Sequence, residues 1–182
     1  MARSASLFAV GVLAGMIAIV WLPEAAAGVE RSIAEFVQYG QGLGLGPTGL
    51  FAFIVINNIV KAAVMMFAGI VFGLIPIFFL VFNGMVLSVV AALIANKAGA
   101  LVAVAGLLPH GIIEISAVLL AAAAGLRLGA VAVERLRRRD VKLKLELARA
   151  WRFFVSLVLP ALLVAAVIES LGTPLLLMMA MG

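Results

Sequence analysis

The sequence predicts an all-α membrane protein, a polytopic bundle of about five transmembrane helices. Of its 182 residues, 66% are hydrophobic and 12% are charged, whereas soluble domains are about 45–50% apolar with about 25% charge. A soluble globule of this size could not bury so much apolar surface. Helices rather than isolated strands are expected because lipid cannot satisfy an open backbone. The composition therefore excludes a soluble enzyme, a disordered chain and a nucleic-acid-binding protein.

Five stretches are long and apolar enough to cross about 30 Å of hydrocarbon. They span about residues 4–22, 50–73, 75–95, 109–129 and 153–171, in a single membrane domain of residues 1–182. The first stretch follows Arg3 and precedes Ala25-Ala26-Ala27, which is the pattern of a secretory signal with its cleavage site. Its apolar run is long for a signal, so we expect a retained membrane helix.

The fourth stretch belongs to an apolar region, residues 98–129, that is too long for one simple span and has Pro109 near its middle. One interpretation is a single kinked helix. The other is a re-entrant half-helix to about Leu107 followed by a span from Pro109, since proline is well tolerated in the first turn of a helix. We favour the half-helix, which must pack within protein to survive at membrane depth.

Residues 25–39 have the pattern of an amphipathic helix lying on the outer membrane surface. Val29, Ile33 and Phe36 share one helical face, and charged residues occupy the others. The glycine-rich residues 40–49 then predict a flexible turn into the second span.

The charge distribution predicts the orientation. Residues 127–152 carry nine Lys or Arg and three acids, whereas residues 23–49 carry three Glu and one Arg. Segments rich in Lys and Arg stay in the cytoplasm, so residues 130–152 are expected to form a cytoplasmic helical hairpin that turns near Asp140. In this multi-pass cell-membrane protein the N-terminus is then cytoplasmic and the C-terminus lies outside.

The hairpin region contains a candidate cytoplasmic basic surface. Its members are Arg127, Arg135, Arg137, Arg138 and Arg139. Two uses are open: attraction to anionic lipid headgroups of the bilayer, or docking of a cytoplasmic protein partner.

Small residues mark places where helices can pack closely. The pairs Gly11/Gly15, Gly69/Gly73 and Gly125/Gly129 each have the small-xxx-small spacing. We expect at least one pair to lie between helices of the same subunit. A homo-oligomer is also open.

Six polar residues inside the spans form the candidate site, an intramembrane polar cluster. Its members are Asn57, Asn58, Lys61, Asn83, His110 and Glu114. Residues four apart share a helical face, as Asn57 and Lys61 do. A single charge buried in a membrane is expensive and pairing offsets most of its cost, so we expect Lys61 and Glu114 to approach each other. The cluster either orders the helices or binds a substrate, ion or proton.

The sequence gives little support for a catalytic site or a metal-binding site. His110 is the only histidine and the chain contains no cysteine, so a zinc site would have to borrow ligands. No serine lies in the sequence context of a serine nucleophile. We expect no enzyme activity, no catalytic residue, no metal and no cofactor.

The polar residues lie in a recognisable context. The run Leu107-Leu108-Pro109-His110-Gly111-Ile112-Ile113-Glu114, followed by Ala117 and the segment 124–129, resembles the signature of the stage II sporulation protein M family. The pair Asn57-Asn58 and the run Phe82-Asn83-Gly84 resemble its other recurrent features. The resemblance covers roughly residues 51–129. It implies about five membrane helices, no catalytic activity, and functional roles for the matched residues Asn57, Asn58, Asn83, His110, Glu114 and Arg127.

Two functions follow as hypotheses. The family's namesake is similar to a scaffold that localises cell-wall hydrolases during engulfment, so the resemblance implies a non-catalytic scaffold or assembly factor with a cytoplasmic or membrane protein partner. The buried polar residues and the half-helix instead favour a small-solute or ion permease or channel, or a subunit of one. Water access to Lys61 and Glu114 discriminates between the two.

The orientation can be tested by cysteine labelling, because the chain itself is cysteine-free. Arg137→Cys should be protected from a membrane-impermeant maleimide in intact cells, and Glu30→Cys should react. Reaction of Arg137→Cys in intact cells would reverse the assigned orientation.

Overall fold

The computed structural model describes residues 1–44, 47–137 and 142–168, and every element in them is helical. In chain order the elements are α1 (Ala2–Trp21), α2 (Pro23–Gly42), α3 (Pro47–Phe67), the short 3-10 helix η1 (Ala68–Ile70), α4 (Leu74–Ala98), α5 (Ala100–Leu136), α6 (Leu143–Phe153) and the π-helical segment η2 (Phe154–Val158). The all-α prediction is confirmed.

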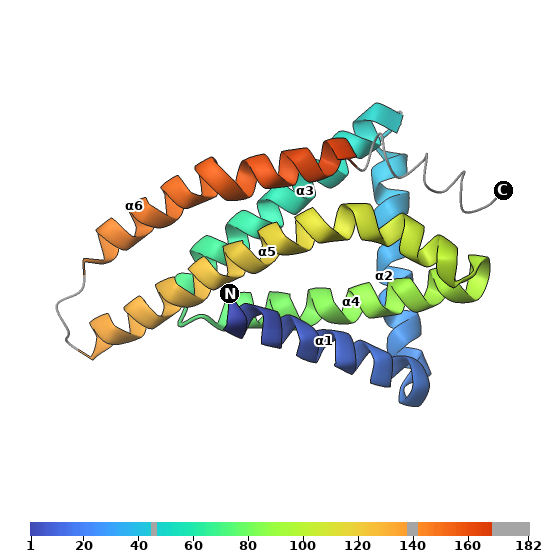
Figure 1. Ribbon diagram of the computed structural model, residues 1–182, viewed down its shortest axis with the longest axis horizontal. Coiled ribbons are helices and arrows are strands. Elements are labelled where there is room, and N and C mark those ends of the chain that lie inside the picture. The colour runs from blue at the N-terminus through green and yellow to red at the C-terminus, as the bar shows by residue number, and fades with distance from the viewer. Residues whose placement is uncertain (45–46, 138–141, 169–182) are drawn as a thin grey trace.

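Five helices in the described part of the chain are long and apolar enough to cross a membrane, as predicted. They cover Ala2–Trp21, Phe51–Ile70, Leu74–Ala98, Gly111–Leu136 and Leu143–Ile168. In Figure 1 these helices run roughly along the long axis of the molecule, while α2 crosses them near one end. Lys97 at the end of α4 forms an ion pair with Glu30 of α2 at 3.0 Å. An exposed pair of this kind stabilises by no more than about 1 kcal/mol.

The predicted glycine pairs all lie between helices of one subunit. A Cβ added at Gly11 of α1 would collide with the backbone of Val81 in α4, and one at Gly84 would collide with Phe8. Likewise Gly69 of η1 touches the backbone of Gly125 in α5. In lipid no hydrophobic effect drives helices together. Close backbone approach of this kind supplies the van der Waals contact that holds them together instead.

The turn between η1 and α4 is fixed by the same kind of contact. Gly73 has a φ of 77°, a left-handed conformation that only glycine adopts without strain. A Cβ at Gly129 would collide with the backbone of Gly73. The α3–α4 turn is therefore seated directly on α5, at the level of Gly129.

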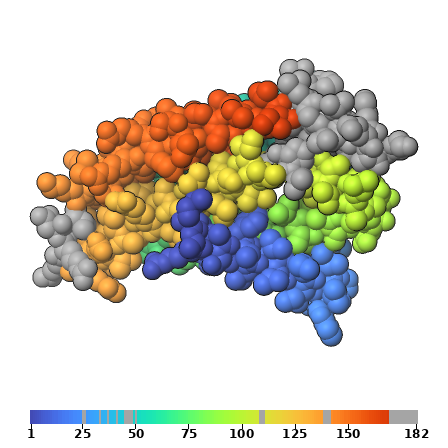
Figure 2. Space-filling view, in the orientation of Figure 1, coloured from blue at the N-terminus to red at the C-terminus, as the bar shows by residue number. Residues whose placement is uncertain are grey.

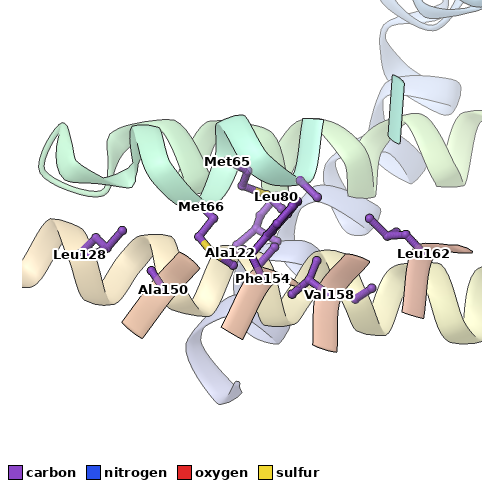
Figure 3. Packing of buried hydrophobic residues seen from close by; sticks show 12 residues of the cluster. Met65, Met66, Leu80, Ala122, Leu128, Ala150, Phe154, Val158 and Leu162 are labelled. Atoms are coloured by element: carbon purple, nitrogen blue, oxygen red, sulfur yellow. The ribbon is translucent and has the colours of Figure 1, made fainter. Parts of the chain in front are cut away.

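A buried hydrophobic cluster lies mainly between α3, α5 and the helix that runs from α6 through η2 (Figure 3). It comprises Ala62, Met65, Met66, Leu80, Ala117, Ala121, Ala122, Leu128, Ala150, Phe154, Val158 and Leu162. The alanines of α5 let the larger side chains of α3 and η2 approach it. Phe67 packs on Phe154 and Trp151, with ring centroids 5.9 Å and 6.1 Å away. Interactions of this type add about 0.5–1.5 kcal/mol per aromatic pair.

The favoured half-helix ending near Leu107 is wrong, because α5 runs through this region as one helix of 37 residues. Proline removes a single backbone hydrogen bond and crowds the carbonyl four residues earlier, which can bend a helix without ending it. The first part of α5 curves in Figure 1, in keeping with this effect. The alternative left open, one kinked helix, describes α5.

Helices α5 and α6 continue beyond the rest of the bundle. The α3–α4 turn lies beside Gly129, yet α5 extends to Leu136 and α6 begins at Leu143. Figure 1 shows both helices projecting past the start of α1 and past that turn. The predicted turn near Asp140 lies outside the described residues.

The glycine contacts predict a specific stability defect. Gly125→Ala would place a methyl group against the backbone carbonyl of Met65, and such overpacking costs about 1–3 kcal/mol. We expect a lower melting temperature in detergent. The control is Gly28→Ala in α2, where a Cβ meets nothing within 4 Å and helix propensity favours alanine. Equal melting temperatures for the two variants would contradict the close packing.

Candidate functional site

Three packed helices carry the candidate polar residues. Asn57, Asn58 and Lys61 lie on α3, Asn83 lies on α4, and Glu114 lies on α5. Helix α5 packs against both α3 and α4, and this arrangement makes Glu114 the centre of the site.

Glu114 and Asn58 line a small cavity between α3, α5 and the helix that follows η2. Its volume is about 10 Å³, and Ala165 and Ala166 close it from the last helix. This is close to the smallest space that holds one water molecule. The Oε2 atom of Glu114 is itself buried. The Asn58 side of the site is therefore tightly packed.

On its α4 side, Glu114 lines a second cavity of about 220 Å³ together with Asn83. The amide Nδ2 of Asn83 donates a hydrogen bond to the carbonyl of Phe79, one turn earlier in α4, at 2.6 Å. This local bond satisfies part of the amide, and the side chain still borders the cavity.

The second cavity adjoins a larger apolar groove of about 510 Å³ between α4 and α5. Leu87, Leu107, Gly111 and Ile115 line both spaces. Ser116 also lines the groove. Its hydroxyl donates a hydrogen bond to the carbonyl of Ile112, one turn earlier in α5, at 2.6 Å. The groove thus offers an apolar path along α4 and α5 toward the Glu114 carboxylate.

Lys61 interacts electrostatically with Glu114, but it does not point into the packed cluster. The residue is exposed on the protein, and its ammonium nitrogen lies 5.5 Å from the ring centroid of Phe36 in α2. Side chains on a helix lean toward its N-terminus, and a lysine can extend along an apolar surface to place its charge elsewhere. Phe36 then contributes a cation–π contact.

The structure therefore brings together part of the predicted cluster. Asn58, Asn83 and Glu114 surround two cavities, and Lys61 lies within electrostatic range. Asn57 is half-buried one turn before Lys61. His110 belongs to α5 one turn before Glu114, but its side chain lies outside the described residues, so its role in the cluster stays a prediction.

The predicted basic surface divides into two parts. Arg127 reaches across to α6, where its Nε lies 3.0 Å from Oε2 of Glu146. Arg135 and Arg137 are exposed on the projecting end of α5. Arg138 and Arg139 lie outside the described residues.

Sequence reasoning missed the partners of Arg127. Arg149 also binds Glu146 within α6, and Arg3 lines a hollow with Arg127 beside the start of α1. The spacing of Glu146 and Arg149 is a local signal that could have been read, because residues three apart face each other on a helix. The position of Arg3 could not, because it depends on how α1 packs.

The fold and the site are those of a polytopic α-helical membrane protein with a polar centre between its helices. The model of the stage II sporulation protein M family matches residues 4–174, and the chain belongs to this family. The match extends well beyond residues 51–129, which carry the sequence motifs that resemble the family. No curated protein and no solved structure matches the chain significantly.

Coupling between Lys61 and Glu114 can be measured by a double-mutant cycle in detergent melting. Lys61→Ala and Glu114→Ala should each destabilise the protein, and the double variant should lose less than the sum, by about 0.5–3 kcal/mol. The control cycle combines Glu114→Ala with Lys97→Ala, whose partner is Glu30, and should be additive within about 0.5 kcal/mol. Additive losses in the first cycle would mean that the two charges do not interact.

Proposed function

We propose that this protein is a non-catalytic membrane scaffold or assembly factor. The observation that carries the proposal is the backbone-to-backbone packing at Gly11, Gly84, Gly69 and Gly125. These contacts join α1 to α4, and the α3–α4 connection to α5, without side chains that could slide or change rotamer. A bundle held in this way favours one conformation, which suits a protein that positions others.

The projecting end of α5 and α6 is the part that a cytoplasmic partner would meet. Leu136 and Arg137 of α5 and Lys144 and Leu145 of α6 are exposed there. Positive charge with interspersed leucine fits a partner protein with an acidic surface that surrounds an apolar patch. The positive-inside rule supports placing this end in the cytoplasm.

A second candidate, a permease or channel subunit, is favoured by one observation. The apolar groove between α4 and α5 leads to a cavity that Asn83 and Glu114 border. A carboxylate and an amide at the end of an apolar path suit a solute with a cationic or hydrogen-bond-donating group. Transport would require α1 and α4 to move relative to α3 and α6.

Spin-label distances separate the two candidates. Met16→Cys on α1 and Leu163→Cys beyond η2 are both exposed, and labels there report movement across the bundle. A scaffold should give one narrow distance distribution in lipid nanodiscs at acidic and neutral pH. The control pair, Phe78→Cys and Lys97→Cys, lies on α4 alone and defines the width that the labels themselves contribute.

A second distance population that Glu114→Gln abolishes would overturn the scaffold proposal and favour transport. Solute or proton flux in proteoliposomes, lost in the same variant with folding intact, would lead to the same conclusion.

A further inference from the structure

Two arginines from different helices share one carboxylate at the end of the bundle that the charge bias assigns to the cytoplasm. Arg127 of α5 and Arg149 of α6 each bind a different oxygen of Glu146. The Glu146 side chain is only 15% exposed, whereas those of Arg127 and Arg149 are 67% and 52% exposed. Each guanidinium has five N–H donors, more than one carboxylate can saturate, so both arginines keep donors for a further anion.

A hollow of about 410 Å³ opens beside these arginines, between α5 and α6. Leu120, Ala124 and Arg127 lie on one face of α5, because they are spaced by four and three residues. The facing residues of α6 include Arg149 and Phe153. The hollow is therefore apolar at one end and basic at the other.

A second hollow, of about 360 Å³, lies on the other side of Arg127, between α5 and the start of α1. Arg3 and Ser4 line it from α1, and Ala123 and Arg127 belong to both hollows. On the face shown in Figure 2, the start of α1 lies over α5, and α6 runs along the opposite side of α5. Arg127 thus stands between two neighbouring hollows.

The depth of these hollows matches the boundary of a membrane. Arg127 is two residues from Gly129, which touches the α3–α4 turn, and Arg3 is in the first turn of α1. Leu120 lies seven residues before Arg127, about 10 Å deeper along the helix. Charged groups are at the level of the turns, and apolar lining extends toward the bilayer centre.

We propose that the two hollows form a binding site for a phospholipid with a net negative headgroup. The phosphate would bind Arg127 and Arg149 with Arg3 close by, and an acyl chain would fill the apolar end of the hollow between α5 and α6. Arg3, Arg127 and Arg149 against Glu146 leave a net charge of +2 among the charged side chains that line the site. Basic pockets between membrane helices on the cytoplasmic side are suited to such headgroups, and each hollow has the size of a ligand pocket. The site is independent of whether the protein is a scaffold or a permease.

The test is a lipid titration of the purified full-length protein in detergent, read by native mass spectrometry and by melting temperature. Dioleoyl phosphatidylglycerol should bind and stabilise at least fivefold more tightly than dioleoyl phosphatidylcholine. Arg127→Gln and Arg149→Gln should each weaken that binding about fivefold. Ala123→Leu should also weaken it, because it fills both hollows and changes no charge.

The matched controls are Arg135→Gln and Arg137→Gln, which remove the same charge from α5 beyond the hollows and should leave binding unchanged. Because Arg149→Gln keeps the bond between Arg127 and Glu146, it remains informative even if Arg127→Gln fails to fold.

Three results would overturn the site. Equal weakening by Arg137→Gln would indicate diffuse attraction to the surface, and full binding by Ala123→Leu would show that no acyl chain occupies the hollow between α5 and α6. Stabilisation by inorganic phosphate or a polyaspartate peptide to the same extent as by the lipid would exclude a lipid-specific pocket.

Discussion

Close approach of helix backbones at glycine is the constraint on which the rest of this structure depends. In a bilayer, apolar side chains gain little by leaving lipid for protein, so helices associate where their surfaces fit tightly. Gly11 and Gly84 provide that fit between α1 and α4, and Gly69 and Gly125 provide it between η1 and α5. These contacts leave no room for a Cβ, and so they set the depth of each helix against its neighbour.

The position of the polar centre follows from that register. Because η1 is fixed against Gly125 and α5 is continuous, Glu114 is held about 11 residues, or about 16 Å, from this contact. There it faces Asn58 on α3 and Asn83 on α4. A carboxylate with tight packing on one side and a larger cavity on the other is consistent with a structural role. The open groove on the α4 side is the feature that a transport role would use.

How much the sequence could predict depended on the range of the interaction. The spans were predictable because crossing a bilayer requires a length and a composition, which are local properties. The pairing of Lys61 with Glu114 stays a prediction from the sequence, made because a lone charge in lipid is costly. The direction of Lys61 toward Phe36 was not predictable, because it requires knowing where α2 crosses α3. The prediction of a half-helix before Pro109 was wrong for a different reason. The local chemistry of proline permits either a bend or a break, and packing decides between them.

Helix α5 joins the two regions where polar groups gather, and its geometry keeps them apart. Glu114 and Arg127 are 13 residues from each other, which separates them by about 20 Å along the axis and places them on different faces. Glu114 faces the α3–α4 side, and Arg127 faces α1 and α6. A lipid held between Arg127 and Arg149 would brace α6 and α1 against α5 without reaching the polar centre. Helix α5 is also packed on the α3–α4 turn through glycine contacts. Binding at the Arg127 end would therefore act on a helix whose position is already fixed, which favours a rigid bundle over a change of conformation.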